Sequence, residues 1–255
     1  MTTSGIYRWR TWMQRLLHQS IRHPQPVVCP VRYSEAKPLR QETETTREFF
    51  RETDVSASSC ERYMLWIDGV GAYQVCVGSE FLIGGPTMEQ ASADICLMAN
   101  LSRRHATIQR RGEDWFILPH QSTVVSGRVV TGPTLLKSGD AMTLAERVKL
   151  GFRIPSVLAG TAIIDFESHH RPPQSVNGII LMTDSVLLGP RRDYHVCCPD
   201  WPDMVVIYRQ DQQLRCRSKV PLTVNGDRIK DSVVLTDGAL VSSEEFRFRI
   251  EKIKT

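Results

Sequence analysis

The sequence predicts an all-β fold made of two tandem β-sandwiches, and three observations lead to this expectation. From residue 60 onward, short runs of β-forming residues alternate with turn residues at close intervals, which is typical of a sandwich or barrel. The pattern of the first half returns in the second half. The chain has 255 residues, of which 41% are hydrophobic and 24% charged, which is enough for two globular domains with a core each.

Residues 1–22 are expected to form a basic amphipathic helix. Apolar residues recur every three or four positions, at Ile6, Trp9, Met13, Leu17 and Ile21. Residues 1–32 contain five arginines and no acid. One hypothesis is a helix that docks on a partner protein or a membrane surface. The other hypothesis is a helix that packs on the β domains, or an ill-ordered tail.

Residues 23–59 are predicted to be a flexible linker. Prolines interrupt any periodicity in the first part, and the second part is mostly polar. Threonines lie among acidic residues there, which makes them either kinase substrates or, as the simpler interpretation, solvated linker residues.

The first β domain is predicted over residues 60–157. We expect its strands at Tyr63–Ile67, Ala72–Val77, Phe81–Ile83, Ala106–Gln109, Trp115–Leu118, Val124–Val125, Val129–Val130, Met142–Leu144 and Val148–Ile154. Pro155 is expected to end the last strand, because proline has no backbone N–H for the ladder.

The second β domain is predicted over residues 158–255, because four segments of the first domain have counterparts there. The matched segments end at Gly84 and Gly189, Gly127 and Gly226, Gly139 and Gly238, and Ile154 and Ile250, with offsets of 105, 99, 99 and 96 residues. Repeats of solenoid proteins are about 20–50 residues long. The offsets therefore indicate a duplicated domain.

Composition argues against several classes of function. The net charge of +4 comes without a dense basic block, so nucleic acid is not expected as a partner. The seven cysteines have no zinc-site spacing, which favours buried thiols in a reducing compartment. No apolar run reaches the about 18 residues of a membrane span, and no secretory signal is recognised, so a cytoplasmic location is expected.

No catalytic residue, metal site or cofactor is expected. His169 and His170 precede two prolines in a loop without a matching ligand set. Cys197 and Cys198 have no base at a recognisable spacing, and no Gly-rich nucleotide-binding loop is present. The sequence therefore predicts a protein that is not an enzyme.

Residues 101–105, Leu-Ser-Arg-Arg-His, carry the strongest candidate motif. They follow a strand that ends in Gly84 and precede Ser126-Gly127 and a Gly-Asp turn at 139–140. This order resembles the forkhead-associated (FHA) domain, a β-sandwich that recognises phosphothreonine. The resemblance covers roughly residues 60–157.

The resemblance implies which residues bind the phosphopeptide and which support the site. In the FHA family the serine that matches Ser102 contacts the phosphate, and the histidine that matches His105 holds the loop. The expected phosphopeptide-binding residues are Ser102, Arg103, Arg104 and Ser126. The expected structural residues are Gly84, His105 and Gly127.

The chemistry of the loop suits a phosphate. Phosphothreonine carries close to two negative charges and three acceptor oxygens. Ser102 offers a hydroxyl donor, its neighbours offer charged donors, and no acid lies between Ala99 and Arg111. The expected partner is a phosphothreonine-containing protein, and the chain would act as an adaptor.

The sequence departs from the family at three places in the first domain. Gly85 stands where the family has an arginine, Ser126 replaces an asparagine, and the Asn-Gly of the preceding loop has no counterpart between Gln121 and Val124. The second domain has no Ser-x-x-His between Cys198 and Arg209, so it is expected to be a degenerate FHA-like sandwich. The alternative hypothesis is a phosphate-independent scaffold.

Overall fold

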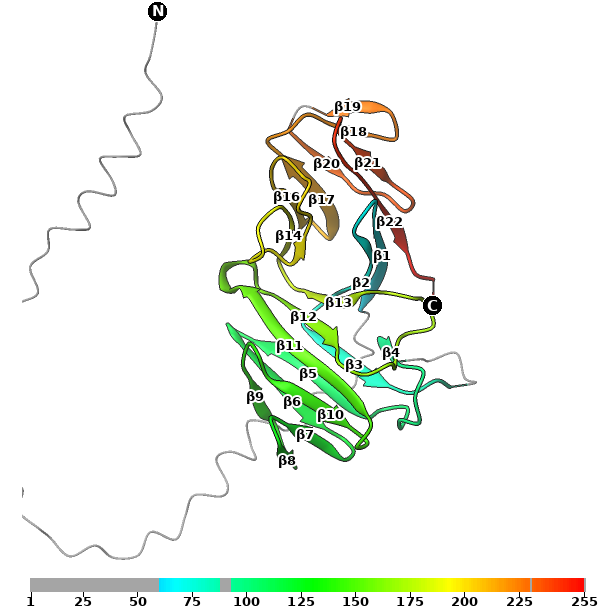
Figure 1. The fold of residues 1–255 in the computed structure, drawn as a ribbon, viewed down its shortest axis with the longest axis vertical. Coiled ribbons are helices and arrows are strands. Elements are labelled where there is room, and N and C mark those ends of the chain that lie inside the picture. The colour runs from blue at the N-terminus through cyan, green and yellow to red at the C-terminus, as the bar shows by residue number, and fades with distance from the viewer. Residues whose placement is uncertain (1–59, 88–92, 230, 255) are drawn as a thin grey trace, which may run out of the picture. The chain divides into compact units, whose positions relative to one another are not determined.

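The structure, a computed structural model, describes residues 60–87, 93–229 and 231–254 (Figure 1). The predicted helix of residues 1–22 and the predicted linker of residues 23–59 lie outside this described part. No helix among the described residues is long and apolar enough to cross a membrane. The described residues are almost entirely strands and turns, which confirms the all-β class.

The first half of the described chain contains eleven strands. They are β1 (Glu61–Ile67), β2 (Gly71–Val77), β3 (Glu80–Gly84), β4 (Ile95–Cys96), β5 (Ala106–Arg111), β6 (Asp114–Pro119), β7 (Thr123–Val125), β8 (Arg128–Val130), β9 (Thr134–Leu136), β10 (Ala141–Leu144) and β11 (Val148–Ser156).

The second half also contains eleven strands, which follow the 3₁₀ helix η1 (Val157–Ala159). They are β12 (Thr161–Phe166), β13 (Gly178–Met182), β14 (Ser185–Gly189), β15 (Val196–Cys197), β16 (Val205–Gln210), β17 (Gln213–Ser218), β18 (Leu222–Val224), β19 (Asp227–Ile229), β20 (Ser232–Val234), β21 (Leu240–Ser242) and β22 (Arg247–Lys252).

Strand β11 ends later than the sequence suggests. It continues through Pro155 to Ser156, and its register against β12 shifts between Arg153 and Ser156. A proline is tolerated where the ladder is irregular, because no inter-strand hydrogen bond from its nitrogen is needed there. The chain then turns through η1 and Gly160, whose φ is 58°.

The strands form one large sheet and two small ones. The twelve-stranded sheet has the order β19-β18-β21-β22-β1-β2-β13-β12-β11-β10-β7-β8. One five-stranded sheet has the order β4-β3-β5-β6-β9, and the other has the order β15-β14-β16-β17-β20. The two small sheets therefore have the same pattern, with corresponding strands of the two halves in corresponding places.

The large sheet is built by an exchange of hairpins between the two halves. β1, the first strand, pairs with β22, the last strand of the second half, and β12 pairs with β11, the last strand of the first half. β2 and β13 join the two halves as a parallel pair (Figure 1). Each half thus extends its part of the sheet with the opening hairpin of the other half.

Two hydrophobic cores follow this exchange. The first core includes Phe81, Ile108, Trp115, Leu150 and Phe152, together with Ala162 and Ile164 of β12. The second core includes Val186, Trp201, Ile207, Phe246 and Phe248, together with Leu65 and Ile67 of β1. The opening hairpin β1–β2 therefore packs mainly in the core of the second half. The ranges 60–157 and 158–255 remain sequence predictions of the domains.

Strand β13 contributes to both cores at once, and every residue in it is buried. Ile179 and Leu181 lie in the first core, whereas Ile180 and Met182 lie in the second core. Successive side chains of a strand point to opposite faces. The two cores consequently lie on opposite faces of the shared strands, and neither is complete without β13.

The two halves also brace their short strands in the same way. The Leu82 amide of β3 donates to the Asp94 carboxylate at 2.8 Å. At the corresponding place in the second half, the Leu187 amide of β14 donates to Nδ1 of His195 at 2.9 Å. The same strand amide is thus bound in both halves, by a carboxylate in the first half and by an imidazole in the second half.

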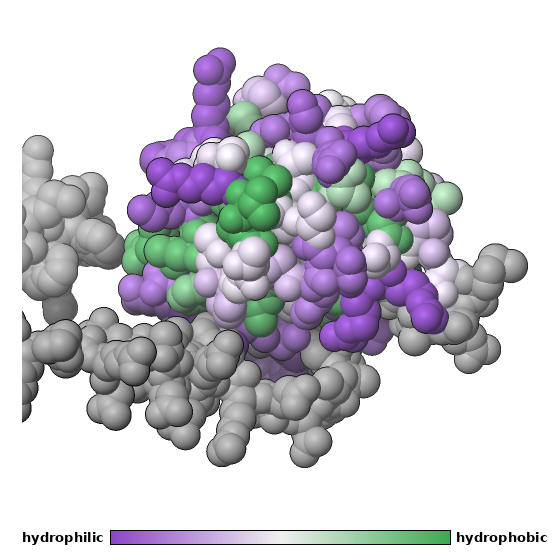
Figure 2. Space-filling model, turned by 90° about the horizontal axis from the view of Figure 1, so that it is seen from below, coloured by the Kyte–Doolittle hydropathy of each residue, from purple (hydrophilic) through white to green (hydrophobic). Residues whose placement is uncertain are grey.

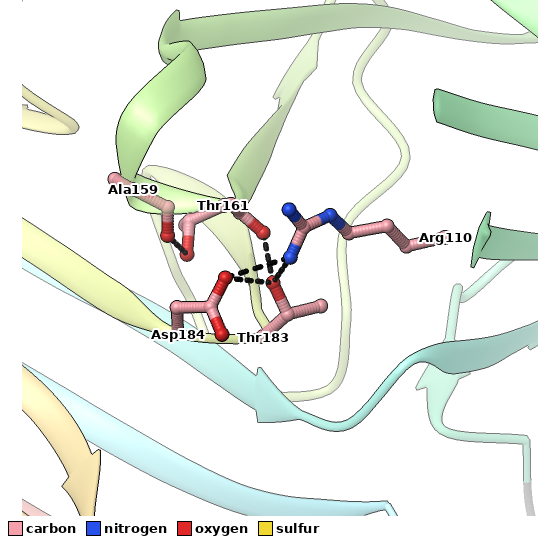
Figure 3. A network of polar contacts seen from close by, with 6 residues as sticks. Arg110, Ala159, Thr161, Thr183 and Asp184 are labelled. Carbon is pink, nitrogen blue, oxygen red and sulfur yellow. Dashed lines mark hydrogen bonds and ion pairs between the residues drawn. The ribbon is translucent and has the colours of Figure 1, made fainter. Parts of the chain in front are cut away.

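A polar network joins the halves where the chain passes from one to the other (Figure 3). Nη1 of Arg110, on β5, donates to the Thr183 hydroxyl at 2.5 Å and to the Asp184 carboxylate at 2.7 Å. The Thr183 hydroxyl in turn donates to the carbonyl of Gly160. A Cβ at Gly160 would lie 2.1 Å from that carboxylate, so the network needs a glycine there.

Candidate functional site

Four loops meet at one end of the first core. β3 and β4 run parallel and both end there, and the β4–β5 loop (residues 97–105) begins there. The β10–β11 turn (residues 145–147) and the β6–β7 loop (residues 120–122) are joined by a hydrogen bond from the Ala145 amide to the Ser122 carbonyl at 3.2 Å. The β12–β13 loop (residues 167–177) arrives at the same end, because Phe166 pairs with Leu150 near the start of β11. We call this set of loops the first loop end.

Two consecutive glycines allow the β4–β5 loop to pack directly on the end of β3. A Cβ at Gly84 would lie 2.0 Å from the Arg103 carbonyl oxygen, and one at Gly85 would lie 2.4 Å from the Leu101 carbonyl oxygen. The Gly85 amide also donates to the Ser102 carbonyl at 3.1 Å. The backbone of the Ser-Arg-Arg segment is therefore held against β3 by contacts that no larger residue permits.

His105 is buried, with 2% of its surface exposed, and it joins the β4–β5 loop to the β6–β7 loop. Its carbonyl accepts hydrogen bonds from the amides of His120 at 2.9 Å and Gln121 at 3.0 Å. Its ring Nε2 lies 3.0 Å from the Ser122 carbonyl oxygen. A carbonyl only accepts, so Nε2 must carry the proton and donate. The imidazole therefore links the two loops by a hydrogen bond.

Ser102, Arg103 and Arg104 are exposed at the tip of the β4–β5 loop. Burial lowers the pKa of His120 on the β6–β7 loop, and the charge of Arg104 lowers it further. The structure thus brings together Gly84, Ser102, the two arginines and His105, with two cations at the surface. Such a surface attracts an anion.

Ser126 and Gly127 lie elsewhere. They form the β7–β8 turn with φ of 45° and 79°, the left-handed values of a tight hairpin turn. This turn follows β7, whereas the β6–β7 loop precedes it. The Ser126 hydroxyl donates to the Asp140 carboxylate at 2.7 Å. The structure therefore does not bring Ser126 to the first loop end, and a phosphate beside it would meet a carboxylate.

The corresponding end of the second core has the opposite charge. A hollow of about 310 Å³ lies between the β1–β2 turn, the β15–β16 loop and the β21–β22 turn. Four carboxylates line it, at Asp68, Asp200, Glu244 and Glu245, against one cation, Arg247, which lies 3.9 Å from the Asp68 carboxylate. Asp68 belongs to the exchanged hairpin, so sequence reasoning within one repeat does not place it there.

One of the two arginines that follow β14 is paired with an acid of its own loop. Arg191 pairs with the Asp193 carboxylate at 2.5 Å, and both side chains are more than half exposed. The aromatic rings of Trp201 and Phe246 stack at 4.1 Å beneath the acidic rim. The degenerate character of the second repeat stays a sequence prediction.

The described residues contain no group of three or more His, Cys, Asp or Glu side chains positioned to hold a metal ion. The six cysteines among them are free thiols. Burial raises the pKa of the Cys198 and Cys216 thiols to about 12, so both are protonated at neutral pH. A protonated thiol is a poor nucleophile.

The family model of the FHA domain matches residues 76–145, which include β3–β10 and the Ser-Arg-Arg-His loop. This part of the chain is therefore similar to the FHA family. No curated protein matches the chain.

Solved structures of FHA domains resemble parts of the chain. One is Mycobacterium tuberculosis EmbR in complex with a low-affinity phosphopeptide, with 20% identity, coverage of 32% of this chain and 23% of that chain, and a TM-score of 0.27. The FHA domain of CT664 from Chlamydia trachomatis has 20% identity, coverage of 33% and 90%, and a TM-score of 0.25. The N-terminal FHA domain of EssC, a component of the bacterial Type VII secretion apparatus, has 11% identity, coverage of 76% and 95%, and a TM-score of 0.21.

Proposed function

We propose that the chain is a non-enzymatic adaptor that binds phosphothreonine peptides at the first loop end, through Ser102, Arg103 and Arg104. It would do so as a pair of FHA-like sandwiches in the cytoplasm, the second of which does not bind phosphate. The observation that carries the proposal is a Ser-Arg-Arg tip that is exposed while its backbone is held by Gly84, Gly85 and His105.

The binding mechanism follows from the donors at the tip. The Ser102 hydroxyl donates to one phosphate oxygen, and the arginine side chains supply charge-assisted hydrogen bonds to the others. A loop that is already ordered loses little conformational entropy when the peptide binds. The anchoring of this loop therefore favours affinity directly.

Gly85 explains how the site is organised without the family arginine. The Leu101 and Ala99 carbonyl oxygens lie 2.4 and 3.2 Å from the place where a Cβ would stand at residue 85. A side chain there is incompatible with the close packing of the loop. The proposal therefore assigns the cationic role to Arg103 and Arg104 alone.

The test is a titration of the full chain with a degenerate phosphothreonine peptide library and with its unphosphorylated twin. We expect selective binding of the phosphorylated library. Ser102→Ala should weaken it by about 1.5–3 kcal/mol, the value of a hydrogen bond to a charged group. Ser126→Ala, on the β7–β8 turn, is the matched control and should leave the affinity unchanged. Equal affinities of the wild type and Ser102→Ala would refute the role of Ser102.

A phosphate-independent scaffold is the second candidate, favoured by exposed apolar residues. On the face shown in Figure 2, hydrophobic patches lie among hydrophilic residues. Leu158 and Val157 of η1 are 98% and 71% exposed, and Val157 borders a hollow of about 380 Å³. Equal binding of both peptide libraries would favour this candidate.

Docking of residues 1–22 on a partner or membrane stays a prediction. Liposome flotation of the full chain, compared with a chain that lacks residues 1–22, tests the membrane hypothesis.

A further inference from the structure

The β12–β13 loop belongs to the second half of the sequence, yet the hairpin exchange places it at the first loop end. The Met98 amide, near the start of the β4–β5 loop, donates to the Arg171 carbonyl at 2.8 Å. The Lys149 amide of β11 donates to the Ser168 hydroxyl at 3.1 Å. The loop is therefore tied both to the segment that leads into Ser-Arg-Arg-His and to the start of β11.

This loop presents two neighbouring imidazoles, whose ring planes are tilted by 32°. The rings of His169 and His170 lie 4.0 Å apart between centroids, and His169 is exposed. Nδ1 of His170 lies 3.1 Å from the Ser168 hydroxyl. The Arg171 guanidinium packs 4.4 Å from the centre of the Phe166 ring and donates to the carbonyls of Ser168 and His170. Arg171 thus fixes the backbone of the loop that carries the pair.

The charges around the pair are mainly positive. Arg147 on the β10–β11 turn, Lys149 on β11 and Arg171 are cations, and both Arg147 and Lys149 are exposed. Burial lowers the pKa of His170, and the neighbouring charges of His169, Arg147 and Arg171 lower it further.

Two acids lie on the same segments as these cations. Glu146 precedes Arg147 on its turn, and the Glu167 carboxylate lies over Gly151, 2.9 Å from where its Cβ would stand. Three arginine and lysine charges thus outnumber two carboxylates before either histidine is protonated.

We propose that His169, His170 and Arg147 form a second anion subsite, which takes the carboxylates of aspartate or glutamate residues flanking the phosphothreonine. This inference rests on the proposed function, since the same peptide occupies the Ser102 loop. The preferred partner would be a phosphothreonine within an acidic sequence. The hairpin exchange makes the specificity of the first sandwich depend on a loop of the second repeat.

The subsite makes the preference for acidic peptides depend on pH. In the free protein, burial and the neighbouring charges hold the pKa of His170 below about 6.5, the ordinary value for histidine. A bound carboxylate favours the charged imidazolium and raises the pKa in the complex. Binding therefore takes up protons, and affinity for an acidic peptide rises as the pH falls through this range.

The experiment compares two phosphothreonine peptides on the full chain, one with aspartate runs on both sides and one with asparagine runs. At about pH 6 the aspartate peptide should bind about fivefold more tightly, as expected for two exposed ion pairs, and the preference should shrink at about pH 8. His169→Asn/His170→Asn should remove this pH dependence and leave the affinity for the asparagine peptide unchanged. Arg147→Gln, on a different segment, should reduce the preference at both pH values.

Each outcome separates this inference from the proposed function. Phosphate-dependent binding with equal affinities for the two peptides, or a preference that the double variant retains, would overturn the subsite and leave the proposed function standing. The unphosphorylated aspartate peptide could instead bind as tightly as its phosphorylated form and lose this binding in the double variant. That result would support the subsite and refute phosphothreonine recognition. Absence of binding to all peptides would overturn both.

Discussion

The strands shared by the two cores predict that the two halves unfold together. Ile179 and Ile180 are neighbours in β13, both are fully buried, and their side chains enter the first and the second core respectively. Replacing either isoleucine by alanine removes a large buried side chain and leaves a cavity, at a cost of about 2–5 kcal/mol. Because both cores need β13, either substitution should destabilise both cores by the same amount.

The assay is urea unfolding followed by tryptophan fluorescence. Trp115 lies in the first core and Trp201 in the second. Proteins in which the other four of the five tryptophans are replaced by phenylalanine therefore monitor each core separately. With a slope of about 3 kcal/mol per M, a loss of about 3 kcal/mol moves the midpoint by about 1 M. Leu158→Ala, at a side chain that is 98% exposed, is the control and should shift it very little.

The refuting result is a separation of the two curves. If Ile180→Ala lowers the midpoint reported by Trp201 and leaves that reported by Trp115 in place, the sandwiches unfold independently. The shared strand would then not couple the cores, and the hairpin exchange would have no thermodynamic consequence.

Three further predictions concern single positions. Gly85→Arg should abolish phosphopeptide binding instead of improving it, because a Cβ there meets the Leu101 carbonyl oxygen at 2.4 Å, and unchanged or tighter binding in the titration would contradict this. Burial lowers the pKa of His195 to about 4 in the folded protein, whereas in the unfolded chain it is about 6.5. The unfolded chain therefore binds this proton first as the pH falls, and the free energy of unfolding should drop by about 3 kcal/mol between about pH 6.5 and about pH 4. His195→Asn keeps an acceptor for the backbone amide and should lose this drop of about 3 kcal/mol, the whole contribution of His195, when urea unfolding is measured across the pH range. If the variant and the wild type have the same pH profile, burial of His195 does not cause the loss of stability. A double-mutant cycle of Arg110→Ala and Asp184→Ala should give a coupling energy of about 1 kcal/mol in thermal unfolding, and strict additivity would show that the pair contributes nothing.

The strands could be predicted from the sequence because alternation and turn residues are local properties. The segment Trp115–Leu118 was expected as a strand and lies within β6, and the turn at Asp68-Gly69 separates β1 from β2. Pro155 was misleading since a single residue ends a strand only where its amide is needed. The irregular register at that point removes the need.

The hairpin exchange had no local signal in the sequence. The segments that become β1–β2 and β12–β13 are both short apolar hairpins, and each has a pattern that suits pairing with either β11 or β22. Which last strand each hairpin joins is decided by packing in three dimensions, where β13 is buried on both faces. The position of His169 and His170 at the first loop end depends on this pairing, so it could not be predicted either.

The candidate site was only partly predictable for the same reason. The Ser-Arg-Arg-His segment is contiguous, so its residues come together whatever the topology. Ser126 lies at the far end of β7 from the first loop end. Only the pairing of β7 with β10 puts Ser126 beside Asp140. The crowding at Gly85 is a contact between segments sixteen residues apart, from Leu101 to Gly85, which spacing alone does not reveal.

The pairing of β1 with β22 also sets how the molecule responds to mechanical force. The two strands are antiparallel, so the start of β1 and the end of β22 lie side by side, where Tyr63 faces Lys252 and the Lys252 ammonium contacts the Glu61 carboxylate at 2.8 Å. Tension between these two points pulls the strands apart from one end and breaks their hydrogen bonds in succession, which takes less force than shearing them all at once. Under tension, the β1–β22 pair would therefore separate first.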